Sequence, residues 1–273
     1  ISMNSSANFL HNLYKAFRDF TESFSYWRIF CLIGINDIRK RYSRSKLGQL
    51  WLTLSLAIQI GSLGFVWGYL FKMPLADYFP YLATGIIFWN FMLSTVTEGS
   101  SVYINSISYL KELTIPKLSY INSLFVKNII ILLHNIVVLI PIFLYYGISL
   151  SFAGIFYTLI GFLVTCIALY FTIIPLALLS LRFRDCPNII LSLSQIVFYV
   201  TPIMWKLESM PERVRQYIMF NPVAVFLSFC RDPLIGSTMP DVYYLVGAFY
   251  IVSMFILSVL LFSKYRARIV YWL

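Results

Sequence analysis

Charged side chains are scarce in this sequence, and acidic ones are the scarcest. Only 12% of the 273 residues are charged, and 11 Asp and Glu stand against 21 Lys and Arg. A soluble domain carries charge on about a quarter of its residues, so the composition excludes a soluble enzyme, a coiled coil and a disordered chain. Instead, 60% of the residues are hydrophobic and 18% aromatic. These proportions predict an all-α polytopic membrane protein.

The sequence also lacks the motifs of several chemistries. No GxxxxGK[ST] occurs, so this chain should not hydrolyse ATP, and HExxH and GxSxG are missing as well. The four cysteines have no CxxC or metal-ligand spacing. The basic residues occur in short clusters between apolar runs, a pattern typical of membrane topology and not of nucleic-acid binding. We therefore expect no catalytic residue, no metal site and no cofactor in this chain.

Six apolar runs are long enough to cross about 30 Å of hydrocarbon, which takes about 20 helical residues. They lie at 47–71, 79–97, 121–146, 152–181, 188–205 and 242–263. A further run at 217–230 has only about 14 residues, too few to span, and is broken by Asn221-Pro222. We interpret this run as part of a re-entrant or interfacial hairpin.

The distribution of Lys and Arg predicts the orientation. Basic residues concentrate before the first run, after the fourth and at the C-terminus, so both termini should be cytoplasmic in the bacterial inner membrane. The predicted domains are a cytoplasmic N-terminal segment (1–46), a six-span domain (47–263) and a cytoplasmic tail (264–273). Within the six-span domain, the 98–120 loop should lie inside and the 206–240 segment outside.

Two segments outside the spans have amphipathic character. Residues 9–30 place aromatic and apolar side chains at helical spacing, which predicts a helix in the membrane interface. Residues 103–119 are mildly amphipathic and contain Pro116 near their end, so a short cytoplasmic helix could present a docking surface there.

Few ionisable residues fall inside the spans. Lys127 and His134 are the only ionisable candidates away from the span ends, and no acidic residue lies at a span centre. An ion-driven transporter normally needs such a carboxylate, so energy for uphill transport must come from another subunit. We expect His134 to be a packing residue. Gly61, Gly64 and Gly68 favour close helix packing within the bundle, with dimerisation as the alternative.

Aromatic side chains are the main chemical resource of the chain. Many fall where a belt at the membrane interface would place them. Six others could line a pathway in which flat apolar faces stack on sugar rings. These candidate glycan-channel residues are Trp51, Trp67, Tyr69, Phe198, Tyr199 and Trp205.

Three stretches carry a resemblance to a known family. They are RKRYSRSKLGQLWL at 39–52, RDCPNIILSLSQIVFYVTPIMW at 184–205 and NPVAVFLSFCRDPL at 221–234. In this order, and in register with six spans, they resemble the membrane subunits of type 2 ABC exporters for bacterial surface polysaccharides. The likeness covers nearly the whole chain.

The resemblance implies partners and roles beyond those derived from the residues. It implies a homodimeric pore, two copies of a separate ATPase subunit that binds ATP and magnesium, and a polyprenyl-linked polysaccharide substrate. The 98–120 loop would carry a coupling helix beside the ATPase, and outer re-entrant helices would lie near the exit. The implied coupling residues are Tyr109, Lys111, Glu112, Pro116 and Lys117, and the outer re-entrant residues are Pro211, Asn221, Pro222 and Arg231.

A basic cluster before the first span has two interpretations. Arg39, Arg41, Arg44 and Lys46 could hold the pyrophosphate of the lipid-linked substrate, because bidentate Arg contacts suit a phosphate. The alternative is topology combined with attraction to anionic lipids.

The sequence thus predicts a permease subunit that exports undecaprenyl-pyrophosphate-linked polysaccharide and performs no covalent chemistry. The overall resemblance favours lipopolysaccharide O-antigen over capsular polysaccharide or teichoic acid. An ATPase-independent flippase or channel is the main rival. A membrane-embedded transferase would depend on Glu208, Glu212 and Asp232, which lack ligand spacing.

Overall fold

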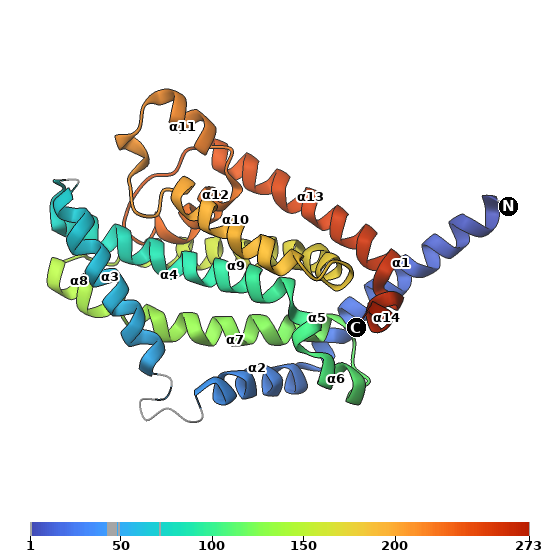
Figure 1. Cartoon of the computed structure of the whole chain (residues 1–273). Helices are drawn as coiled ribbons and strands as arrows, with labels where there is room; N and C mark the ends of the chain where they lie inside the picture. Colours follow the sequence, from blue (N-terminus) through green and yellow to red (C-terminus); the bar gives the residue numbers. More distant parts are fainter. Residues whose placement is uncertain (1, 43–47, 49, 71, 273) are drawn as a thin grey trace.

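The computed structural model describes residues 2–42, 48, 50–70 and 72–272, and this part of the chain contains helices and turns but no strand (Figure 1). The α-helices are α1 (Ser2–Ser25), α2 (Trp27–Tyr42), α3 (Leu50–Leu70), α4 (Leu75–Ser100), α5 (Val102–Asn105), α6 (Ile107–Glu112), α7 (Leu118–Ile136), α8 (Leu139–Tyr146), α9 (Phe152–Arg182), α10 (Cys186–Val200), α11 (Glu212–Ile218), α12 (Pro222–Arg231), α13 (Val242–Tyr265) and α14 (Ile269–Trp272). Two short 3₁₀ helices are η1 (Leu207–Ser209) and η2 (Arg266–Arg268). The prediction of an all-α chain is confirmed.

Five helical segments are long and apolar enough to cross a membrane: α3, α4, α7 with α8, α9, and α13 with its extension to Trp272. They correspond to five of the six predicted spans. The segment predicted as the fifth span forms α10, which has 15 residues, fewer than the roughly 20 that a full crossing needs. Helix α10 ends at Val200, directly before Thr201-Pro202, because a proline lacks the backbone N–H that would continue a helix. The fifth predicted span, and with it the total of six, therefore stays a prediction.

Helix α4 is the centre of the bundle and the most buried of the candidate spans. It packs against α3, α7, α9 and α12, and small residues allow these close approaches. A Cβ atom at Gly64 of α3 would lie 2.7 Å from the ring of Phe79, and one at Gly68 would lie 2.5 Å from Leu75. These two glycines thus serve packing within the chain, as the sequence predicts, whereas Gly61 faces open space within the described part of the structure.

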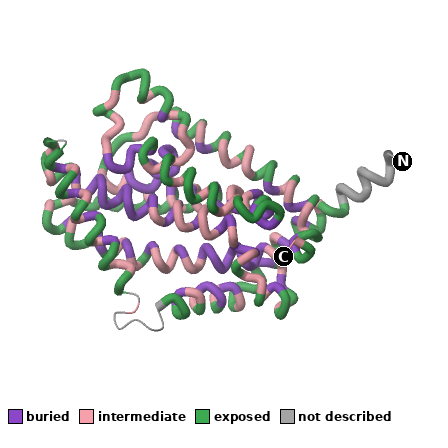
Figure 2. The backbone as a smooth tube through the Cα atoms, in the orientation of Figure 1, coloured by how far each residue is buried: buried purple, intermediate pink, exposed green. Residues whose placement is uncertain are grey.

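Exposed residues lie along the outside of the bundle (Figure 2). Many of them are large apolar side chains. Helix α10 has no buried residue, and α3 and α13 are buried only along a narrow stripe. In water such a surface would be unstable, so these faces are suited to lipid or to another apolar partner.

The N-terminal segment forms two helices, because the predicted continuous helix at 9–30 is broken at Tyr26. Helix α1 buries Ala16, Asp19 and Ser23 against the bundle and leaves Tyr14 and Phe17 exposed. Helix α2 packs along α7. The rest of the bundle therefore covers one face of α1, and only the opposite face of this helix is available to a membrane interface.

Two connecting segments lie at opposite ends of the bundle (Figure 1). We call the end that carries α5 and α6 the α6 end, and the end that carries η1, α11 and the start of α4 the α11 end. Helix α4 continues to Ser100, so residues 98–100 of the predicted 98–120 loop are helical. Both segments hold charged residues, and they form the two candidate regions described below.

Candidate functional site

Glu98 connects three helices near the α6 end. Its Oε1 accepts a hydrogen bond of 2.9 Å from Nη2 of Arg41 on α2, and its Oε2 lies 2.6 Å from Nζ of Lys127 on α7. The side chain of Lys127 is only 12% exposed. A lysine within an apolar span is costly unless it is paired, and Glu98 supplies the carboxylate that pairs with Lys127 there.

A polar cavity of about 210 Å³ borders this triad of Arg41, Glu98 and Lys127. It lies between α3, α4 and α7, and its polar lining residues are Arg41, Ser55, Gln59, Asn90, Ser94, Glu98 and Asn135. Such a concentration of amide and hydroxyl groups is unusual in an apolar bundle and indicates a place where water or a polar group can reside.

The predicted basic cluster reaches this cavity through one residue. Arg41 lines the cavity, whereas Arg39, two residues earlier on α2, is exposed and does not line it. Arg44 and Lys46 lie outside the described residues. Within the described part of the chain, Arg41 is therefore the one residue of the predicted phosphate-binding set that contacts Glu98 and lines the cavity.

The predicted coupling residues divide into two groups. Leu110 and Ile115 are buried and anchor α6 and the turn that follows it, so Lys111 and Glu112 stand exposed. Tyr109 accepts a 2.8 Å hydrogen bond from Nζ of Lys40 on α2. This bond raises the pKa of Lys40 above its ordinary value, because it favours the charged ammonium.

The second group of coupling residues lies away from that exposed surface. Pro116 is partly buried, and Lys117 lines a separate cavity with residues of α1 and η2. Of the five predicted coupling residues, Lys111 and Glu112 are the exposed ones, and they lie on a helix that is tied to α2 through Tyr109 and Lys40.

The predicted channel aromatics are not gathered around one cavity. Helix α3 packs against α4 and α7, whereas α10 packs against α4 and α9. Trp51, Tyr69 and Tyr199 are exposed, while Trp67 and Phe198 are partly buried against the core and Phe198 lies 5.6 Å from the ring of Trp89. Trp205 donates a 3.3 Å hydrogen bond to the carbonyl of Tyr199. The exposed members therefore face away from this chain.

At the α11 end, Arg231 is buried at the end of α12. Its Nε donates to Oδ1 of Asp232 at 2.8 Å, and its Nη1 donates to the carbonyl of Pro202 at 2.7 Å. The guanidinium carbon lies 4.0 Å from the ring centre of Tyr81 on α4, which adds a cation–π contact. Arg231 thus joins α12, the loop after α10 and α4.

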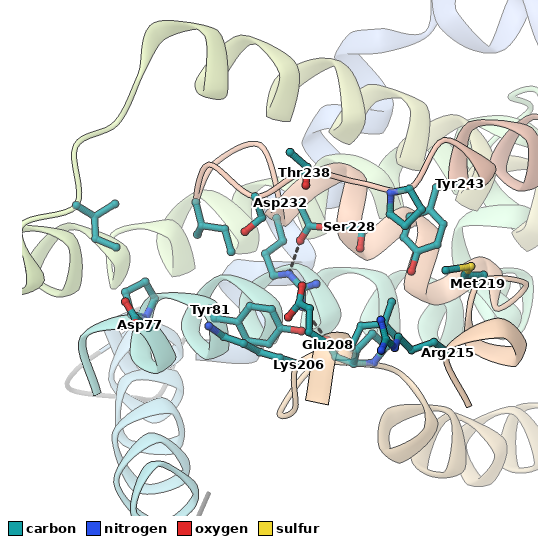
Figure 3. A pocket seen from close by; sticks show the side chains of 18 of the residues that line it. Asp77, Tyr81, Lys206, Glu208, Arg215, Met219, Ser228, Asp232, Thr238 and Tyr243 are labelled. Atoms are coloured by element: carbon teal, nitrogen blue, oxygen red, sulfur yellow. Dashed lines mark hydrogen bonds and ion pairs between the residues drawn. The ribbon is translucent and has the colours of Figure 1, made fainter. Parts of the chain in front are cut away.

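A cavity of about 440 Å³ opens beside Arg231 (Figure 3). Charged groups of both signs line it: Asp77, Lys206, Glu208, Arg215, Arg231 and Asp232. The hydroxyl of Tyr81 lies 2.9 Å from the carbonyl oxygens of both Pro202 and Trp205. These contacts secure the loop after α10 as one wall of a polar opening.

The other outer residues have local structural roles. Pro211 precedes α11, and Asn221 caps α12 by accepting a 3.0 Å hydrogen bond from the Val223 N–H. The Asn221 amide also donates to Oγ1 of Thr201 at 3.2 Å, and Pro222 occupies the first turn of α12, where its missing N–H has no cost.

Sequence reasoning did not assign Glu98 a role, because it placed this residue at the start of a loop. The available signal was Lys127 itself, since a lysine in an apolar span needs an acidic partner. The ion pair of Arg266 with Asp19, at 2.6 Å, was also missed. These two residues are far apart in the sequence, and no local spacing connects them.

These features define a multi-pass membrane protein whose charged groups gather near the two ends of an apolar helical bundle. No protein-family model matches the chain. The chain is 22% identical over 237 residues to an O-antigen export system permease protein RfbA of Klebsiella pneumoniae, a match that covers 87% of this chain and 92% of that protein. A second K. pneumoniae protein of the same name is 23% identical over 240 residues, with 87% and 92% covered.

A third relative comes from a different organism. The O-antigen export system permease protein RfbA of Myxococcus xanthus is 22% identical over 229 residues, which cover 81% of this chain and 85% of that protein. The resemblance to polysaccharide-export permeases that the three sequence stretches carry is thereby confirmed.

Proposed function

We propose that this chain is the permease subunit of an ATP-driven exporter that moves undecaprenyl-pyrophosphate-linked O-antigen across the bacterial inner membrane. The observation that carries the proposal is the similarity along 87% of the chain to relatives whose names state O-antigen export. The motif order and the apolar helical bundle support it. ATP and magnesium are held by a partner ATPase.

The triad supports a point of substrate entry near the α6 end. Arg41 keeps about half of its side chain exposed while it contacts Glu98. A guanidinium in this position can exchange a carboxylate for a phosphate at small cost, because both anions accept paired N–H donors. In the proposal, Arg39, Arg41, Arg44 and Lys46 hold the pyrophosphate while Lys127 keeps Glu98 neutralised.

The exposed part of α6 supports coupling to an ATPase. Lys111 and Glu112 present charges of both signs on a helix whose apolar side is buried, an arrangement suited to a polar docking surface. The hydrogen bond between Lys40 and Tyr109 links α6 to α2, which carries Arg41. A displacement of α6 by the ATPase would thus be transmitted to the proposed entry site through the contact between Tyr109 and Lys40.

The exposed apolar faces support a homodimer. Helices α3 and α10 carry the exposed aromatics Trp51, Tyr69 and Tyr199. In a dimer, these faces would line the translocation path between two copies or pack across it. The cavity beside Arg231 would then lie near the exit, with both termini cytoplasmic.

Copurification with the native gene neighbourhood tests the proposal. The tagged protein is purified in mild detergent, its partners are identified, and ATP hydrolysis by the complex is measured. We expect a P-loop ATPase at equal stoichiometry. Exchanging Lys111 and Glu112 for alanine should release that ATPase, because it removes both exposed charges of α6.

The matched control exchanges Glu212 and Arg213 of α11 for alanine. These residues are also adjacent, exposed and of opposite charge, but they lie at the α11 end. The ATPase should stay bound in this control. Recovery of the wild-type protein alone, with no ATP hydrolysis, would contradict the proposal and favour a flippase or channel. Recovery of the ATPase with a different glycan lipid would change only the substrate to capsule or teichoic acid.

A further inference from the structure

A second cavity near the α6 end is strongly basic. It has a volume of about 310 Å³ and lies between α1, the start of α7 and the end of α13 with η2. Its charged lining residues are Lys15, Arg18, Lys117 and Arg266, and no carboxylate of the described residues lines it. Four cations around one hollow repel one another unless an anion joins them.

Nearby carboxylates offset only part of this charge. Arg18 pairs with Glu22 at 3.2 Å, and Arg266 pairs through its Nε with Asp19. Among the described residues, Lys15 and Lys117 form no ion pair. The cavity therefore keeps two positive charges without a counterion from the described part of the chain.

The guanidinium of Arg266 is held in a fixed orientation. Asp19 is 2% exposed, and its Oδ2 lies 2.6 Å from Nε of Arg266. This contact uses the Nε edge of the guanidinium, and the two Nη groups donate to no other described residue. Arg266 can thus present its remaining donors to a ligand in the hollow.

Lys117 adds a charge that is partly removed from water. It directly precedes α7, and burial lowers its pKa below the ordinary value, an effect that nearby Arg266 reinforces and Asp19 opposes. An anion bound beside Lys117 would offset this cost.

The location of the cavity indicates which kind of anion it would bind. Lys117 stands one residue before the apolar segment that begins at Leu118, so the hollow lies at the boundary of the apolar bundle. Basic pockets between membrane helices at such boundaries suit the phosphate groups of lipids. Arg and Lys together provide the paired donors and point charges that a phosphate accepts.

We propose that the cavity lined by Lys15, Arg18, Lys117 and Arg266 is a binding site for a phosphate group, supplied by the headgroup of an anionic phospholipid or by a soluble phosphate. The site is distinct from the Arg41 cluster and does not rest on the proposed export function. Occupancy by a phosphate would fix α1 against α7 and the C-terminal helices.

The test measures binding to the purified full chain. Native mass spectrometry counts bound molecules after addition of phosphatidylglycerol, phosphatidylcholine or inorganic phosphate, and thermal unfolding is followed under the same conditions. We expect phosphatidylglycerol to be retained and to raise the unfolding temperature, and phosphatidylcholine to do neither. Retention of inorganic phosphate alone would also support the site and would identify the source as soluble.

The test variant combines Lys15→Gln and Lys117→Gln, which leaves the Arg266 pair with Asp19 intact. It should weaken anion binding by about tenfold or more, since each basic residue near a membrane surface contributes measurably to attraction. The matched control combines Lys264→Gln and Arg268→Gln, which remove the same charge from exposed positions outside the cavity lining. The control should bind like the wild type.

A third variant separates a binding defect from a folding defect. Lys117→Arg keeps the charge and should keep binding within a few-fold of the wild type. Equal loss of binding in the test and control variants would overturn the proposal, because it would show a general effect of surface charge. Equal retention of the charged and the neutral lipid by the wild type would overturn it as well.

Discussion

The Nζ atom of Lys127 lies 2.6 Å from Oε2 of Glu98, and this ion pair fixes the middle of α7 against the end of α4. Arg41 of α2 contacts the other carboxylate oxygen. One carboxylate therefore serves two cations from two helices. The net charge of the triad is positive, which suits a surface that is proposed to meet an anionic lipid.

Removal of one member of this ion pair should destabilise the fold. The variant Lys127→Met leaves Glu98 partly buried with Arg41 as its remaining partner, so its cost should stay below the roughly 3–5 kcal/mol of a fully buried pair. The variant Arg41→Ala should cost less than about 1 kcal/mol, because half of the Arg41 side chain is exposed. Thermal unfolding monitored by size-exclusion chromatography compares the two.

A double-mutant cycle isolates the coupling within that pair. Combining Lys127→Met with Glu98→Gln should recover part of the stability lost in Lys127→Met, since the partly buried carboxylate that has lost its lysine is then replaced by a neutral amide. Strictly additive losses would contradict a direct interaction between Glu98 and Lys127.

The Arg231 contacts predict a defect at the α11 end. Arg231→Met should lower stability by several kcal/mol, because it leaves Asp232 nearly buried without its partner and removes one of the two donors to the carbonyl of Pro202. Arg215→Met removes an arginine from the same cavity, but one with a partly exposed side chain, and should cost less than about 1 kcal/mol. Similar unfolding temperatures for both variants would show that Arg231 does not secure this end.

Two glycine positions offer a matched test of helix packing. A Cβ atom at Gly161 of α9 would overlap the backbone carbonyl of Phe229, whereas one at Gly61 of α3 meets no atom of the described residues within 4 Å. Gly161→Ala should therefore destabilise the fold by about 1–3 kcal/mol or more. Gly61→Ala should be neutral or slightly stabilising, since alanine favours helix. Thermal unfolding of the two variants side by side measures the difference.

The contact between Lys40 and Tyr109 predicts a functional effect without a structural one. Tyr109→Phe removes the hydroxyl that accepts the 2.8 Å hydrogen bond and keeps the ring. Unfolding temperature should stay unchanged, while ATP-dependent export should fall several-fold if α6 acts on α2. Wild-type export by Tyr109→Phe would remove this contact from the coupling path.

Exposure distinguishes the aromatic candidates from one another. Tyr199 is 67% exposed, so Tyr199→Ala should lower transport with little change in stability. Trp67 packs partly against the core, and Trp67→Ala should lower stability together with transport. Export assays in cells, normalised to protein abundance, separate the two effects. Unchanged transport in Tyr199→Ala would count against a channel lining formed by this residue.

Local composition was sufficient to predict the spans, but not the contacts between them. The apolar runs that become α3, α4, α7 with α8, α9 and α13 could be read directly, because hydrocarbon selects continuous apolar helices. The segment at 188–205 shows the limit of that method. Its helix ends at Val200, and the remaining residues turn back so that Tyr81 and Arg231 bind the carbonyl of Pro202.

For the candidate site, too, the sequence predicted the segments but not the contacts between them. The sequence indicated that Arg41, Tyr109 and Arg231 lie in functional segments, because each falls within or beside a motif or an amphipathic stretch. It did not reveal Glu98 as the partner of Arg41, or Lys40 as the partner of Tyr109. These pairs are separated by 57 and 69 residues and are set by helix packing, for which a single sequence carries no local signal.

Reconstituted transport tests the central claim most directly. The purified protein with its ATPase is placed in vesicles that contain the undecaprenyl-linked glycan, and a membrane-impermeant lectin or glycosidase reports glycan on the side opposite the ATPase. The account predicts that ATP increases glycan on that side and that a variant of the partner unable to hydrolyse ATP abolishes the increase. Glycan that crosses equally well without ATP or without the partner would contradict an ATP-driven exporter.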